Sequence, residues 1–255
     1  MFFSPTTFIG IDPTAGKKPF AYAAIDPARQ LLALGQDNMD TILAFAAGQS
    51  QAIVAVCSPF CPNQGLMENE KVRQELSPPP KPGRWTDFRV AEYLLRQRNI
   101  KIPKTPSKIQ DCPGWVQKGF ILYARLKEIG YRQYPSEGAS RQFLEVYPHG
   151  CYAVLLGQNP LLKHTLEGRL QRQLCLYEQR LNVADPMRFF EEITRHRLLN
   201  GVLPFEELRS PQELDALAAA YTAWMSTLHP NQITMLGDPV EGQIVLPGVE
   251  LKERY

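Results

Sequence analysis

The stretch Thr7–Cys57, TFIGIDPTAGKKPFAYAAIDPARQLLALGQDNMDTILAFAAGQSQAIVAVC, decides the fold class. It opens with three short apolar runs, Thr7–Asp12, Phe20–Asp26 and Leu31–Leu34, which are separated by segments rich in Pro, Gly and charged residues. This pattern predicts three consecutive strands. Because the connections are short, each strand is expected to pair antiparallel with the next.

A helix and a fourth strand follow. Apolar residues recur at helical spacing over Met39–Ala46, where Asp37 or Asn38 can cap the start and Gly48 ends the helix. Ala52–Cys57 is then an unbroken apolar run, as expected of a strand that is buried on both faces. The intervening helix allows a crossover, so the fourth strand is expected to lie parallel to the first. The predicted order is β-β-β-α-β.

The rest of the chain alternates helical and short strand patterns. Helices are predicted at Trp85–Arg98, Gly114–Ile129 and Glu213–Leu228, and short strands at Tyr131–Tyr134, Gln142–Tyr147 and Gly237–Pro247. The segment from His149 to Asn200 is mainly helical in pattern. We therefore expect residues 1–255 to form a single α/β domain with a helical insertion at about 150–210.

Composition excludes several classes of protein. The 255 residues include 28 Lys and Arg against 26 Asp and Glu, for a net charge of +2, and 44% are hydrophobic. These values are typical of a globular protein and not of disordered or collagen-like chains. No apolar run reaches the roughly 18 residues of a membrane-spanning helix, so no membrane partner is expected. The five cysteines are scattered without a CxxC pair, which favours a reducing cytoplasm and disfavours a disulfide framework or a cysteine-rich zinc site.

Three carboxylates are candidate site residues, and each also has a structural interpretation. Asp12 ends the first strand, where ligands bind in open α/β sheets, but Asp before Pro also favours a turn. Glu145 interrupts an apolar strand, so it either faces water or is buried and needs a cation or a proton. Asp215 begins an alanine-rich helix that can approach a sheet closely, or it simply complements the helix dipole.

Together the three carboxylates indicate chemistry that none of them indicates alone. The predicted sheet would bring Asp12, Glu145 and Asp215 to one edge, where clustered negative charges are stable only around a cation. Hard oxygen ligands suit Mg²⁺ or Mn²⁺, which can activate water for cleavage of a phosphodiester. The three residues are therefore the predicted metal ligands and catalytic residues of a hydrolase.

The β-β-β-α-β order is that of the ribonuclease H-like fold, and the sequence resembles the family called domain of unknown function 429, regarded as predicted nucleases of that fold. The pieces that carry the resemblance span nearly the whole chain: FIGIDPTAG, AVCSPF, DFRVAEYLLRQRNI, FLEVYPHG, LDALAAAYTA and GDPVEGQIVLP. The resemblance implies that Asp12, Glu145 and Asp215 are the acidic set. It also implies that Asp238 and Glu241 lie in a closing turn and strand, away from the metal.

One departure from the family pattern leaves alternatives open. The family usually has Asp at the end of the fourth strand, where this chain has Cys57. A soft sulfur replaces a hard ligand there, so a binding module for nucleic acid or protein that does not cut is the first alternative. Cys57 could also be a reactive thiol, but a buried, inert cysteine is the simpler interpretation. An ATP-binding protein of the actin and sugar-kinase class is a further alternative, although that class needs two such units and the sequence indicates one.

A basic stretch is the candidate nucleic-acid contact. Arg96–Lys108 contains five basic and no acidic residues, and they could follow a phosphate backbone or form a solvated loop. The five are Arg96, Arg98, Lys101, Lys104 and Lys108. Trp85 or Trp115 could stack on a base, or fill space between helices.

Overall fold

The computed structural model describes residues 6–14, 18–81 and 83–255. In this part of the chain the strands form one mixed sheet with the order β3-β2-β1-β4-β6-β8-β7, and β5 pairs with β6. The strands are β1 (Thr7–Asp12), β2 (Phe20–Ile25), β3 (Leu31–Asp37), β4 (Ala52–Val56), β5 (Arg132–Gln133), β6 (Arg141–Val146), β7 (Thr234–Asp238) and β8 (Gly242–Leu246).

The first five elements have the predicted β-β-β-α-β arrangement. β1 pairs antiparallel with β2, and β2 with β3, whereas β4 returns parallel to β1 after helix α1 (Met39–Ala47). Asn38 is the N-cap of α1, because its side chain accepts a hydrogen bond from the Thr41 N–H at 3.0 Å. The mixed sheet, with its β-β-β-α-β core and flanking helices, is therefore consistent with a ribonuclease H-like fold.

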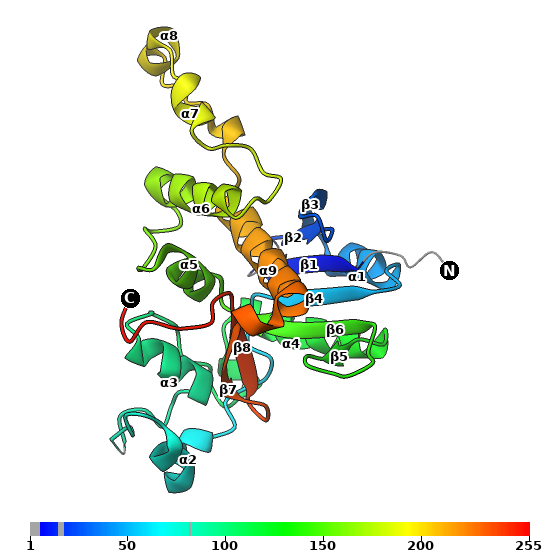
Figure 1. The fold of residues 1–255 in the computed structure, drawn as a ribbon, viewed down its shortest axis with the longest axis vertical. Helices are drawn as coiled ribbons and strands as arrows, with labels where there is room; N and C mark the ends of the chain where they lie inside the picture. Colours follow the sequence, from blue (N-terminus) through cyan, green and yellow to red (C-terminus); the bar gives the residue numbers. More distant parts are fainter. Residues whose placement is uncertain (1–5, 15–17, 82) are drawn as a thin grey trace.

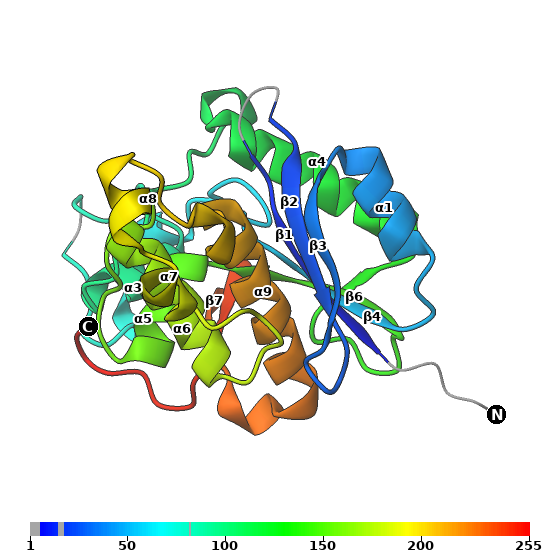
Figure 2. The same cartoon turned by 90° about the horizontal axis from the view of Figure 1, so that it is seen from above.

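Helices cover both faces of the sheet (Figure 2). On one face, α1 and α4 (Gly114–Glu128) enclose a core that includes Ile11, Val56 and Phe143. On the other face, α9 (Pro211–Leu228) lies along β1 and β2, and its buried alanines belong to the larger core. Ser210 and Glu213 form a capping box that fixes the start of α9.

The remaining helices lie in the long connections (Figure 1). They are α2 (Glu70–Glu75), α3 (Val90–Gln97), α5 (Pro148–Leu156), α6 (Leu166–Glu178), α7 (Arg188–Glu191), α8 (Arg195–Leu199), and the 3-10 helices η1 (Leu66–Glu68), η2 (Ile109–Asp111), η3 (Phe205–Glu207) and η4 (Pro230–Gln232). The stretch predicted as a helical insertion thus contains α5 to α8, and α7 and α8 extend away from the sheet. No helix in the described ranges is long and apolar enough to cross a membrane.

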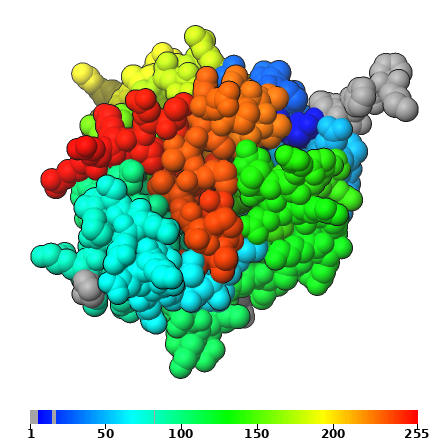
Figure 3. Space-filling view, turned by 60° about the horizontal axis from the view of Figure 1, so that its bottom comes forward, coloured from blue at the N-terminus to red at the C-terminus, as the bar shows by residue number. Residues whose placement is uncertain are grey.

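The C-terminal strands differ from the prediction in one respect. The sequence pattern indicated one short strand over Gly237–Pro247, but the chain forms a hairpin of β7 and β8, and β8 joins the sheet parallel to β6. Figure 3 shows the orange and red end of the chain lying between the cyan and green segments. Gly237 and Gly242 both have positive φ, which lets the hairpin turn tightly.

Candidate functional site

Two of the three predicted carboxylates lie next to each other. Asp12 ends β1, and Asp215 lies in the second turn of α9. The close approach of these elements depends on Gly10, where a Cβ would lie 1.9 Å from the Ala216 carbonyl oxygen. Asp12, two residues after Gly10, is therefore held close to Asp215, which directly precedes Ala216. The alanine-rich sequence of the helix predicted this close approach.

The proximity of the carboxylates changes the acidity of Asp12. Burial and the negative charge of Asp215 raise the pKa of Asp12 to about 8. At neutral pH, Asp12 therefore carries a proton when no added cation is present. Asp12 and Asp215 form the electrostatic centre of the candidate site.

Lys163 supplies one positive charge to this pair. It lies between α5 and α6, and its Nζ is 2.7 Å from Asp215 Oδ2. Burial opposes its charge, but Asp215 and Asp12 outweigh that effect and raise the pKa of Lys163 above its ordinary value. The side chain of Lys163 is 39% exposed, against 8% for Asp215, so Lys163 covers the buried acid from the solvent side.

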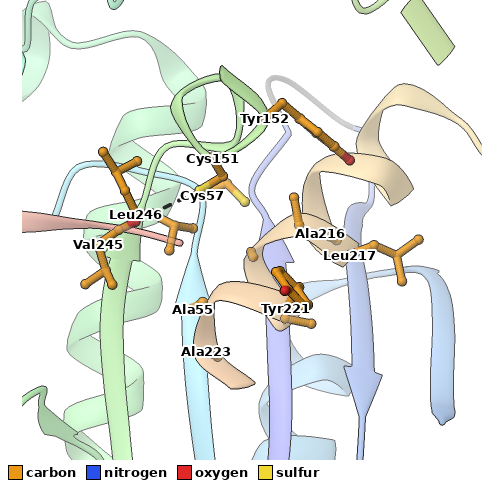
Figure 4. Close-up of a cluster of buried hydrophobic side chains, with 14 of the residues drawn as sticks. Ala55, Cys57, Cys151, Tyr152, Ala216, Leu217, Tyr221, Ala223, Val245 and Leu246 are labelled. Atoms are coloured by element: carbon orange, nitrogen blue, oxygen red, sulfur yellow. Dashed lines mark hydrogen bonds between the residues drawn. The ribbon is translucent and has the colours of Figure 1, made fainter. Parts of the chain in front are cut away.

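Cys57 lies on the same side of the sheet as the acidic pair. Its Sγ is 3.6 Å from the Asp215 carbonyl oxygen, to which it donates a hydrogen bond. Burial, together with the charges of Asp12 and Asp215, raises the pKa of Cys57 well above its ordinary value. Figure 4 shows the side chain in an apolar cluster with Cys151 and Ala216. Cys57 is therefore a buried neutral thiol, and not an activated nucleophile.

Glu145 does not join the pair. It aligns with Val56 across parallel strands, and Val56 faces the α1 and α4 side of the sheet. Aligned residues in parallel strands point to the same face, so Glu145 faces away from α9, whereas Cys57, one residue after Val56, faces toward it. The predicted convergence of three carboxylates is corrected to two, and no group of three metal-ligating side chains occurs in the described ranges.

The charge of Glu145 is neutralised by Arg89. Arg89 Nη2 is 2.5 Å from Glu145 Oε1 and Arg89 Nη1 is 3.0 Å from Oε2, and the Phe60 N–H donates to the same carboxylate. Arg89 also bonds to Glu92, and all three charged side chains are buried. No local pattern in the sequence indicates Arg89 as the partner of Glu145, and the spacing of Arg89 to Glu92 (i, i+3) signals only a local ion pair.

Asp238 and Glu241 lie where the family resemblance implied. Asp238 ends β7, and Glu241 is in the turn before β8. The buried carboxylate of Glu241 accepts hydrogen bonds from the N–H groups of Gln64, Leu66 and Val90. Glu241 therefore joins the hairpin to the loop after β4 and to the start of α3.

The five basic residues are not equally available for a nucleic acid. Arg96 donates to the Ile102 carbonyl, Arg98 to the Leu94 carbonyl, and Lys104 forms an exposed ion pair with Asp87. Lys101 and Lys108 are both exposed. The segment is therefore partly committed to local contacts.

A pocket lies at the carboxyl ends of β4 and β6. Cys57 and Tyr147 line it, and both are also within electrostatic reach of Asp215. The buried Arg89 and Glu145 form part of its wall. This pocket and the acidic pair together make up the candidate site.

Comparison with known proteins identifies a family without a described activity. No curated protein and no solved structure matches the chain. Residues 10–241 match the family described as protein of unknown function (DUF429), and that range includes Asp12, Lys163 and Asp215. The chain belongs to the DUF429 family.

Proposed function

We propose that this protein is a divalent-metal-dependent phosphodiesterase that cleaves nucleic acid, with Asp12 and Asp215 as its acidic centre. The observation that carries the proposal is the contact between the end of β1 and the start of α9, which holds two carboxylates together. Burial and the neighbouring charge of Asp215 raise the pKa of Asp12, and a cation bound beside the two carboxylates would lower it again.

The residues present fit a magnesium or manganese ion. Mg²⁺ is commonly bound by one or two carboxylates, with water and substrate phosphate completing its shell. Asp12 and Asp215 would provide those carboxylates. The ion would supply positive charge to a phosphodiester and favour ionisation of the attacking water.

The other charged residues have separate roles in this proposal. Lys163 neutralises Asp215, and because it is partly exposed it can turn toward a phosphate oxygen of the substrate. Lys101 and Lys108 are exposed and would contact the phosphate backbone further away. Glu145 holds Arg89 in the wall of the pocket and is not a ligand in this proposal.

Binding without cleavage is the second candidate, and the Lys163–Asp215 ion pair favours it. A protein cation already satisfies the most buried carboxylate of the pair, and Cys57 adds no hard ligand. An ATP-binding protein of the actin and sugar-kinase class has no comparable support, because the described ranges contain one β-β-β-α-β unit. The five unpaired cysteines fit the proposed location in a reducing cytoplasm.

The proposal is tested by metal binding and cleavage measured together. Calorimetric titration with Mn²⁺ is expected to detect binding that is lost in Asp12→Asn and in Asp215→Asn. The matched control is Asp40→Asn, which removes a carboxylate that is 83% exposed. Cleavage of single- and double-stranded DNA and RNA should require Mn²⁺ or Mg²⁺ and should follow the same pattern among the variants.

The substitution Cys57→Asp separates the two candidates. It places a third carboxylate beside Asp12 and Asp215, so it should strengthen Mn²⁺ binding. If the wild-type protein neither binds Mn²⁺ at millimolar concentration nor cleaves any of the four nucleic acids, while Cys57→Asp does, the non-catalytic candidate is correct.

A further inference from the structure

The pocket at the carboxyl ends of β4 and β6 has a lining of apolar and charged side chains. Six apolar side chains from three separate segments contribute to the lining. They are Pro59, Ile102, Pro103, Pro113, Trp115 and Val116.

Trp115 differs from the other two tryptophans. Trp85 packs against Phe88 and Tyr93, and Trp224 packs against Tyr221 and His229. Among the described residues, no ring–ring contact involves Trp115, which is half-buried at the start of α4 and lines the pocket. Its indole is therefore available to stack on a planar ligand.

The charged groups of the pocket wall already have partners. Arg89 bonds to Glu145 and Glu92, and Glu92 also accepts hydrogen bonds from the N–H and the hydroxyl group of Thr105. A phosphate or carboxylate placed deep in the pocket would have to displace these buried ion pairs, at a high cost in free energy. The wall therefore favours a neutral, planar group over an anion.

Two residues connect the pocket to the acidic pair. Cys57 lines the pocket and donates a hydrogen bond to the Asp215 carbonyl oxygen. Tyr147 lines it from the end of β6, and its hydroxyl donates to the Lys101 carbonyl in the basic segment. The pocket is thus linked through Cys57 to Asp215 and through Tyr147 to the basic segment.

We propose that this pocket binds the base of a nucleotide by stacking on Trp115, so that the attached phosphate faces Asp12 and Asp215. The proposal of a base site depends only on the pocket and Trp115. The placement of the phosphate rests on the proposed function. The proposal gives the enzyme a nucleotide-recognition site next to its acidic centre.

The base site is tested by calorimetric titration of the full chain, with a chelator present to remove divalent metal ions. Adenosine, guanosine, cytidine and uridine are the probes, and ribose 5-phosphate is the control without a base. At least one nucleoside is expected to bind, and ribose 5-phosphate is not. Trp115→Leu should weaken that binding about 10-fold or more, whereas Trp115→Phe should restore most of it.

The variant Trp85→Leu is the matched control, since it removes an indole outside the pocket, and thermal unfolding confirms that each variant is folded. Binding of ribose 5-phosphate equal to that of the nucleosides would overturn the base site. So would the failure of all four nucleosides to bind below about 10 mM, or equal losses in Trp115→Leu and Trp85→Leu.

The two proposals can fail separately. Mn²⁺ is expected to strengthen binding of the corresponding nucleoside 5′-monophosphate to the wild type but not to Asp12→Asn. If Mn²⁺ has no effect while nucleoside binding still depends on Trp115, the base site is supported and the placement of the phosphate is overturned.

Discussion

Gly10 and Ala216 meet without space for a side chain between them. A Cβ at Gly10 would lie 1.9 Å from the Ala216 carbonyl oxygen, 2.5 Å from the Ala220 nitrogen and 2.9 Å from the Ala219 Cβ. This contact places α9 directly on β1. It is also the reason that Asp12 and Asp215, which are far apart in the sequence, form a pair.

The substitution Gly10→Ala is expected to push α9 away from β1. Overpacking of this kind costs about 1–3 kcal/mol of unfolding free energy, and backbone atoms cannot move aside as a side chain could. Urea unfolding should show the loss of stability, and any Mn²⁺ binding should weaken with it. Gly35→Ala in β3 is the matched control, because its Cβ would meet only Tyr22 at 3.8 Å. Equal stability of the two variants would contradict the proposed contact.

The stability of the metal-free protein is expected to fall as pH rises from about 4 to about 8. Asp12 has a pKa of about 8 when folded and an ordinary value of 3.8, so the folded state holds a proton that the unfolded state has released in this range. Asp12→Asn mimics the protonated acid and should lose less stability over the same range. Melting temperatures at pH 5, 7 and 9 measure the effect. Parallel curves for the two proteins would exclude Asp12 as the source.

Lys163→Met is expected to affect folding and metal binding in opposite directions. Without Mn²⁺ the protein should lose on the order of 1 kcal/mol of stability, because Asp215 is left without its cation; partial exposure of Lys163 keeps the effect modest. Mn²⁺ should bind more tightly, since a competing positive charge has gone. Calorimetry and urea unfolding measure the two effects. Weaker Mn²⁺ binding in this variant would mean that Lys163 assists the metal site and does not compete with it.

Glu145→Gln is expected to lower stability without changing the affinity for Mn²⁺. Removal of one partner from a buried ion pair typically costs about 3–5 kcal/mol, because the remaining charge of Arg89 loses its main partner. Denaturant unfolding measures the loss, and titration of the folded fraction with Mn²⁺ measures binding. Loss of Mn²⁺ binding from a folded Glu145→Gln protein would show that Glu145 is a metal ligand.

Most of the fold could be predicted from local patterns. The alternating runs and turns of residues 7–57 specified three antiparallel strands, a helix and a buried parallel strand, because each of these depends on residues close together in the sequence. The helix at Gly114–Glu128 matched its prediction within one residue. The pairing of β8 with β6 joins segments about a hundred residues apart, and no local pattern specifies it.

The candidate site, like the fold, was predictable only in the parts that depend on local sequence. The sequence indicated Asp12 and Asp215, since a strand end and an alanine-rich helix are both local features. It could not indicate which face of the sheet Glu145 occupies, because a shift of one residue in strand register reverses every side chain. It also gave no indication of Lys163, which reaches Asp215 from a loop 52 residues away.

The sequence by itself therefore determined the first five elements of the sheet and the family, and it indicated the two carboxylates of the candidate site. Only the tertiary structure decided how the charges pair: Asp12 with Asp215 under Lys163, and Glu145 with Arg89 on the other face. The physical reason is that secondary structure follows from neighbours in the chain, whereas the partner of a buried charge is whichever group the packed sheet and helices bring within a few ångströms of it.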